Sequence, residues 1–137
     1  MNAELRSQNA EVYPRDKRSS QEAERDLKVR TKHFAIRIIH LYKSLPHSEE
    51  ARVVGRQFLR SGTSVGANYR AACRARSRAE FIAKLGIVLE EADETVFWLD
   101  ILPEAGVVSK DVVSSLIVEA NELISIFVSS LRTAKGE

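Results

Sequence analysis

The chain of 137 residues contains few cysteines, prolines and aromatic residues, and these shortages exclude several classes of protein. Cys73 is its only cysteine, so an internal disulfide cannot form and a disulfide-stabilised secreted domain is excluded. No apolar run reaches the ~18 residues that a membrane-spanning helix needs. The first residues are polar and of mixed charge, without the apolar core of a signal peptide. We therefore expect a cytoplasmic protein without a membrane partner.

Charge is nearly balanced overall, at a net +2, but it is unevenly distributed along the chain. Residues 51–78 carry seven arginines and no acidic residue, whereas residues 79–137 carry 4 basic and 11 acidic residues. A chain divided in this way either presents a positive surface to a partner or pairs its own halves.

Apolar residues recur at intervals of three and four along most of the chain, which predicts helices and no strands. Residues 1–18 lack this periodicity and include Pro14, so we expect a disordered tail followed by one domain over residues 19–137. Short connections between the helices predict an all-α, antiparallel, up-down-up-down four-helix bundle. The predicted helices cover residues 20–45, 49–76, 78–102 and 110–134.

Serines at fixed spacings predict where three of these helices begin. Ser19 and Glu22 have the spacing of a capping box, as do Ser77 and Glu80. Ser48 precedes two glutamates that would favour the first turn of the second helix.

The second predicted helix contains Gly62 and Gly66, four residues apart. A phosphate-binding loop would place such glycines at a strand-to-helix turn, but these follow at least ten residues of helical pattern. We favour close approach of a facing helix, and a kink or a ligand groove is the alternative. Ser64 and Asn68 lie on the flank of this helix, where we favour hydrogen bonds across a helix interface over the polar edge of a binding surface.

The arginines of this helix are the candidate nucleic-acid ligands. At about 100° per residue, five of them form one stripe of about 33 Å opposite the apolar face, and two more continue it into the next turn. The seven are Arg52, Arg56, Arg60, Arg70, Arg74, Arg76 and Arg78. Such a stripe suits the phosphates of a duplex or of structured RNA. The alternative is a structural scaffold or a protein-docking module, in which these arginines form ion pairs with the acidic third helix, in the same chain or in a neighbouring subunit.

A second set of apolar residues falls outside the main buried faces of the first and third helices. Surface of this kind is typical of a protein interface, and tryptophan is a common anchor there. We therefore predict contacts between subunits at Ile36, Ile39, Ile87, Phe97 and Trp98.

Residues suited to catalysis are scarce. His33 and His40 share a helix face, but no carboxylate at metal-ligand spacing joins them. The acidic residues of the third helix lack the Glu-x-x-His motifs of di-metal bundles. We expect no enzymatic activity, no metal, no cofactor and no small-molecule substrate.

With these residues in view, the chain resembles the small bacterial family of four helix bundle proteins, also called S23 or 23S rRNA intervening-sequence proteins. The most specific segments are LRSGTSVGAN (Leu59–Asn68) and RSRAEF (Arg76–Phe81). LYKSLP (Leu41–Pro46) and LGIVLEEADETVFWLDIL (Leu85–Leu102) also fit. An isoleucine-alanine-glutamate-glycine run follows the asparagine in the better-known family pattern, and Tyr69 to Cys73 replace it here, which indicates a sub-branch.

The resemblance implies a homo-oligomer, with a ring-shaped pentamer as the arrangement known among relatives. A related branch is the accessory protein of diversity-generating retroelements, in which a basic pentamer binds nucleic acid and a reverse transcriptase. RNA or DNA, a reverse transcriptase and further copies of the chain are therefore the partners that the resemblance implies, and it implies no enzymatic activity.

Overall fold

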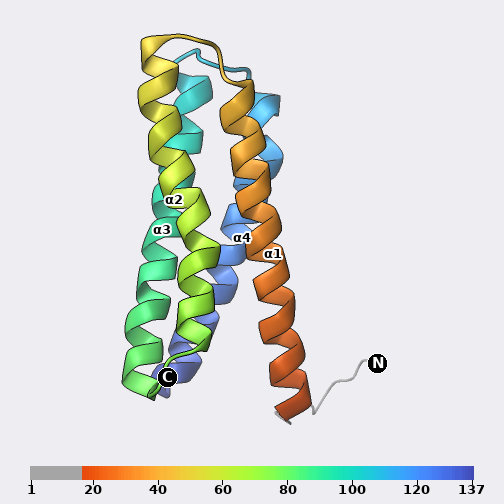
Figure 1. Ribbon diagram of the computed structural model, residues 1–137, viewed down its shortest axis with the longest axis vertical. Helices are drawn as coiled ribbons and strands as arrows, with labels where there is room; N and C mark the ends of the chain where they lie inside the picture. The colour runs from red at the N-terminus through yellow and green to blue at the C-terminus, as the bar shows by residue number, and fades with distance from the viewer. Residues whose placement is uncertain (1–16) are drawn as a thin grey trace. The chain divides into compact units, whose positions relative to one another are not determined.

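The computed structural model describes residues 17–137, with side chains from residue 20, and its regular structure over that range is helical. The helices are α1 (Lys17–Ser44), α2 (Glu49–Cys73), α3 (Arg78–Glu104) and α4 (Lys110–Lys135) (Figure 1). The all-α prediction is confirmed. Residues 1–16 of the predicted tail lie outside the described residues. Since α1 begins at Lys17, residues 17 and 18 are helical, and Ser19 lies inside the helix instead of capping it.

Contacts divide the chain into two units, residues 1–30 and residues 31–137, with the boundary inside α1. The described part of the first unit is the beginning of α1. There, Lys28 Nζ lies 3.2 Å from Glu24 Oε2 in an ion pair one helical turn apart. Both side chains are 40% exposed, so this pair contributes only about 0.3–0.5 kcal/mol. The candidate site lies in the second unit.

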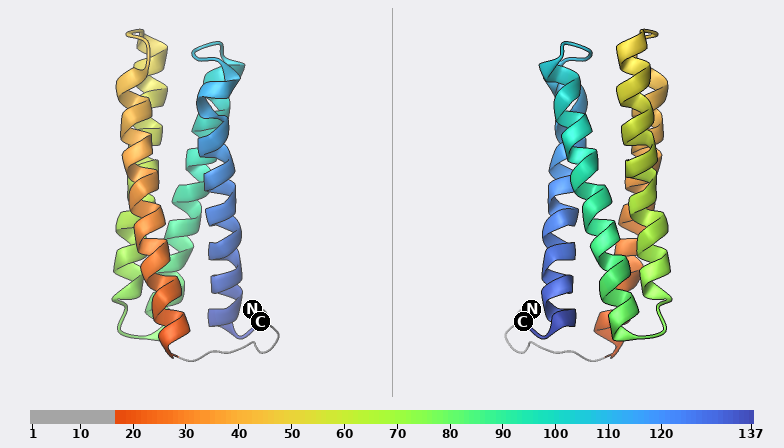
Figure 2. Two further views of the ribbon diagram at one scale, coloured as in Figure 1. Left: turned by 90° about the vertical axis from the view of Figure 1, so that its right-hand side faces the viewer. Right: turned by 90° about the vertical axis from the view of Figure 1, so that its left-hand side faces the viewer.

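Within the second unit, α1 from Thr31 onward, α2, α3 and α4 run in alternating directions (Figures 1 and 2). The connections are short, at residues 45–48, 74–77 and 105–109, so sequential helices are antiparallel. α3 packs against both α2 and α4. The α2–α3 turn and the C-terminus of α4 lie at one end of this unit, and the other two turns lie at the opposite end (Figure 1).

Serine side chains cap α2 and α3 as predicted. Ser48 Oγ accepts a hydrogen bond from the Ala51 N–H at 3.2 Å, and Ser77 Oγ accepts one from the Glu80 N–H at 3.1 Å. Each cap of this kind stabilises a helix by about 1 kcal/mol. The Glu80 carboxylate accepts from the backbone N–H of Arg76 at 2.8 Å, one residue before the serine. Because Ser77 is extended to cap α3, residues 74–76 form the turn, and α2 ends at Cys73 instead of residue 76.

The core of this unit consists of apolar side chains at alternating intervals of three and four. Phe34, Phe58 and Phe127 are among its largest fully buried side chains. On α4, Val112 is 44% exposed and its neighbour Val113 is fully buried. Val113 is in phase with the other buried residues of α4, which are Leu116, Ala120, Leu123 and Phe127.

α4 is strongly apolar on average, although it contains no long unbroken run of apolar residues. By length and composition it could cross a membrane, since one window of it has a mean hydropathy of 1.6. In the fold, α4 is a core helix that packs against α3. Only 28% of that window is buried, so much of its apolar surface lies outside the core.

Candidate nucleic-acid interface on α2 and its contacts with α3

One face of α2 consists of glycines that lie against α1. A Cβ atom added to Gly62 would lie 2.7 Å from Ile38 Cγ1, and one added to Gly66 would lie 3.2 Å from the backbone oxygen of Thr31. A Cβ added to Gly55, which sequence analysis did not single out, would lie 2.8 Å from Leu45 Cδ1, just after α1, and 3.0 Å from the ring of Tyr42 on α1. Side chains at Gly55 and Gly62 would therefore collide with α1, and Gly66 leaves room for one only if α1 shifts slightly.

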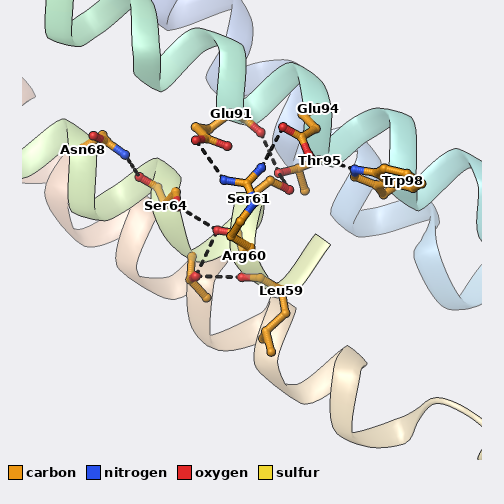
Figure 3. A network of polar contacts seen from close by, with 10 residues as sticks. Leu59, Arg60, Ser61, Ser64, Asn68, Glu91, Glu94, Thr95 and Trp98 are labelled. Atoms are coloured by element: carbon orange, nitrogen blue, oxygen red, sulfur yellow. Dashed lines mark hydrogen bonds and ion pairs between the residues drawn. The ribbon is translucent and has the colours of Figure 1, made fainter. Parts of the chain in front are cut away.

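Ser64 and Asn68 form hydrogen bonds within α2. Ser64 Oγ donates to the carbonyl oxygen of Arg60 at 2.7 Å, and Asn68 Nδ2 donates to the carbonyl oxygen of Ser64 at 2.9 Å (Figure 3). Both bonds run to the preceding turn of the same helix, so neither is the cross-helix bond that sequence analysis favoured. Both residues are half-buried, one and two turns after Arg60 on α2. This position matches the alternative prediction, in which they form the polar edge of a surface.

The buried polar contact between α2 and α3 is formed instead by Ser61 and Thr95, both fully buried. Their hydroxyl oxygens lie 2.8 Å apart, and Thr95 Oγ1 also lies 2.7 Å from the carbonyl oxygen of Glu91 (Figure 3). A hydroxyl carries one proton. When Thr95 donates to the carbonyl, the Ser61 hydroxyl can supply the proton between the two side chains. Sequence analysis missed this pair, although Ser61 is in phase with the buried residues Phe58 and Val65.

Arg60 is held by two carboxylates of α3. Its Nη1 lies 3.1 Å from Glu91 Oε2 and its Nη2 lies 2.8 Å from Glu94 Oε1 (Figure 3). The hydrogen bonds from Arg60 to Glu91 and then to Glu94 raise the pKa of the Arg60 guanidinium. Because the guanidinium is half-exposed, each pair contributes only about 0.2–1 kcal/mol. For Arg60, therefore, the structure shows the alternative to nucleic-acid binding, which is pairing with the acidic helix.

Trp98 extends this network along α3. Its indole Nε1 donates to Glu94 Oε2 at 3.0 Å. This bond, followed by the bonds from Arg60, lowers the pKa of the Glu94 carboxyl. Glu91 differs, because its Oε1 is buried and has no hydrogen-bond partner in the described part of the chain. The network thus connects α2 to α3 and fixes the Trp98 ring.

The remaining arginines of the predicted stripe are all exposed. Arg52 Nη1 lies 3.0 Å from Glu49 Oε1, in an ion pair within the first turn of α2. The others make no side-chain ion pair with any residue that the structure describes: Arg56, Arg70, Arg74, Arg76 and Arg78.

The residues predicted at subunit contacts are exposed to different degrees. Phe97 is 56% exposed, and Ile87, Ile36 and Ile39 are 41–42% exposed. Trp98 is half-buried, and its ring meets that of Phe97 edge-on, with centroids 4.9 Å apart. On α4, Val118 is also 57% exposed and borders a groove of about 600 Å³ at the α3–α4 turn. Sequence analysis did not assign Val118 to this surface.

Metal-ligating side chains do not gather in the fold. No group of three histidine, cysteine, aspartate or glutamate side chains among residues 17–137 as described could hold a metal ion. His33 and His40 are exposed, and the Cys73 thiol is half-buried.

Comparison with known proteins agrees with this fold. Residues 25–129 match the family model of the 23S rRNA-intervening sequence protein. The chain belongs to this family. It is also similar to a crystal structure from Bacteroides thetaiotaomicron, that of a protein with unknown function from the S23 ribosomal protein family. The two chains are 40% identical with a TM-score of 0.72, over 77% of this chain and 97% of the other. No curated protein matches the chain.

The family match confirms the resemblance found in the sequence, and it covers most of the candidate site. Every arginine from Arg52 to Arg78 and the whole Arg60 network lie within the matched residues. Two basic residues at the end of α4, Arg132 and Lys135, lie beyond them.

Proposed function

We propose that this protein is a non-catalytic, homo-oligomeric four-helix bundle that binds nucleic acid, as structured RNA or an RNA–DNA hybrid. The arginines of α2 and of the turn that follows it supply the contacts. The observation that carries the proposal is a row of exposed arginines without acidic partners among the described residues, on a chain whose net charge is only +2.

Two further facts support nucleic acid as the partner. Residues 61–79 contain four arginines and no acidic residue, and arginine binds phosphate through a planar fork of donors. The family is named for the intervening sequence of 23S rRNA, which associates its members with a structured RNA.

Fluorescence anisotropy with labelled RNA duplexes, RNA–DNA hybrids and single strands tests the proposal. We expect binding at low salt that weakens steeply between about 50 and 200 mM salt, because each neutralised phosphate releases counterions. If micromolar protein binds none of these ligands at low salt, the proposal fails.

Self-association is supported by the apolar side chains that remain exposed on the single chain. Phe97 and Val118 are more than half exposed, and isoleucines of α1 and α3 add to this surface. Exposed apolar side chains that gather in one patch are typical of a protein interface, and the rings of Phe97 and Trp98 lie against each other. Light scattering of the purified protein should give a mass of several subunits, and a monomer at micromolar concentration would contradict this part of the proposal.

A second role is favoured for one arginine by a specific observation. Arg60 engages Glu91 and Glu94, so its contribution is to join α2 to α3. An Arg60→Gln variant should lose stability and keep its affinity for nucleic acid, whereas an Arg70→Gln variant should behave in the opposite way.

A further inference from the structure

The arginines that sequence analysis placed on one stripe have different surroundings in the two halves of α2. In the first half, Arg52 is paired with Glu49 and Arg60 with two carboxylates of α3, and only Arg56 has no ion pair with a described residue. An arginine in such a pair must give up its carboxylate before it can bind a phosphate. In the second half and the following turn, no described residue neutralises any of the four arginines, which are Arg70, Arg74, Arg76 and Arg78.

Further basic residues lie at the same end of the second unit. The last turn of α4 carries Arg132 and Lys135, with Glu137 after it, and lies at the same end of the unit as the α2–α3 turn (Figures 1 and 2). The nearby carboxylate of Glu80 accepts a hydrogen bond from the backbone N–H of Arg76 and caps α3. We name this group of six basic side chains the arginine end: Arg70, Arg74, Arg76, Arg78, Arg132 and Lys135.

The opposite end of the unit has more acidic than basic residues. The first turn of α2 begins with two glutamates and the first turn of α4 contains an aspartate, while the end of α3 has no basic residue in its last turn. These acids are Glu49, Glu50, Asp100, Glu104 and Asp111. The same end also carries Lys43, Arg52 and Lys110, so its charges nearly balance, and a polyanion is attracted more strongly to the arginine end.

The chemistry of the arginine end favours phosphate over bases. Tyr69 is the only aromatic residue between residues 60 and 80. It is buried, with its ring centroid 5.9 Å from that of Phe127. Its ring is thus unavailable for the stacking by which single-stranded nucleic acids are usually held. Contacts through phosphate alone favour the ligand with the higher charge density, which is a duplex.

We propose that nucleic acid binds at the arginine end of the bundle, through the phosphates of a double-stranded RNA or RNA–DNA segment and without sequence preference. This inference rests on the proposed function and narrows it from a stripe along α2 to one end of the fold. Arg60, in the first half of α2, then serves to connect α2 to α3, and the second half meets the ligand.

Two variants with the same change in net charge test this location. In the end variant, Arg70, Arg74, Arg76 and Arg78 are changed to glutamine. In the control variant, glutamine replaces four exposed basic residues toward the opposite end, which are Lys43, Arg52, Arg56 and Lys110. Affinity for an RNA duplex is measured by anisotropy over a range of salt concentrations, and circular dichroism checks that both variants fold.

For the wild type, phosphate contacts from all six basic side chains of the arginine end predict a slope of log K against log salt of about −5.4, using the value for duplex DNA. The end variant, which keeps Arg132 and Lys135, should lose affinity on the order of 100-fold at low salt, with a slope of about −1.8. The control variant should stay within about threefold of the wild type, since distant charges are screened. A variant with lysine at the same four positions should keep most of the affinity, and it gives a second measurement if the glutamine variant does not fold.

The outcomes separate this inference from the function on which it rests. If the wild type binds duplex RNA and the control variant loses as much affinity as the end variant, the location is wrong and the function stands. Tighter binding to single strands than to duplexes would also overturn this inference, while the proposed function would stand. If the wild type binds no nucleic acid but binds anionic lipid vesicles or an acidic protein, both proposals are overturned.

Discussion

Close packing of α1 on α2 can be tested by adding one methyl group at two glycines. Gly62 and Gly86 both lie inside helices, on α2 and α3. A Cβ at Gly62 would lie 2.7 Å from Ile38 Cγ1 and 3.0 Å from two further carbons of that side chain. A Cβ at Gly86 would have no heavy atom within 4 Å. Gly86→Ala is therefore a matched control for Gly62→Ala.

The expected magnitudes follow from two opposing terms. Replacing glycine by alanine inside a helix stabilises it by about 0.8–1 kcal/mol, and Gly86→Ala should show most of this gain. At Gly62 the same gain meets a clash, because carbon atoms prefer separations of about 3.5–4.0 Å. Ile38 is fully buried and β-branched, so its side chain has little freedom to rotate away. Overpacking of this kind costs roughly 1–3 kcal/mol, so the Gly62 variant should be about 1–3 kcal/mol less stable than the Gly86 variant.

Urea denaturation of both variants and the wild type provides the measurement. Circular dichroism follows the helices, and fluorescence of Trp98, the only tryptophan, follows its surroundings on α3. All samples need the same protein concentration, because association changes apparent stability. If Gly62→Ala is as stable as Gly86→Ala, then α1 does not lie as close to α2 as the structure places it. Gly66→Ala, with its nearest contact at 3.2 Å, should fall between the two.

Three further predictions concern α3 and its neighbours. Since the folded protein lowers the pKa of Glu94 below 4.5, this carboxylate stabilises the fold above that pH, and the stabilisation is lost as the pH falls through the lower folded pKa. Glu94→Gln should therefore weaken the dependence of the free energy of unfolding on pH at acid pH. Urea unfolding at several pH values measures this, and the same pH dependence in the variant and the wild type would contradict it. Thr95→Val should leave the buried Ser61 hydroxyl without its partner and lower stability by about 1–3 kcal/mol. Adding Ser61→Ala should recover part of that loss, and no recovery would refute the coupling. Phe97→Asp should reduce the mass measured by light scattering while circular dichroism is unchanged, and an unchanged mass would remove Phe97 from the subunit interface.

Local signals in the sequence predicted the helices well, because each signal acts over one or two turns. Ser48 and Ser77 mark helix starts through hydrogen bonds to residues three positions later. Apolar residues at helical spacing, such as Phe34 and Ile38, are buried in the core. Where two apolar residues are adjacent, as at Val112 and Val113, helical periodicity alone does not decide which of the two is buried.

The candidate site was predicted less completely, because its contacts join residues that are far apart in the sequence. Helical angles place Arg60 on the same stripe as Arg70, yet only Arg60 lies between two carboxylates of α3. Neither angles nor composition specify the register of one helix against another.

Sequence by itself determined the four helices, the family and the concentration of arginine in one segment. Only the tertiary structure decided which of those arginines are paired within the fold and which are left exposed. The reason is that pairing depends on the alignment of α2 against α3. That alignment goes with side-chain contacts between the two helices, such as the one between Ser61 and Thr95. Periodicity along a single helix contains no information about these contacts.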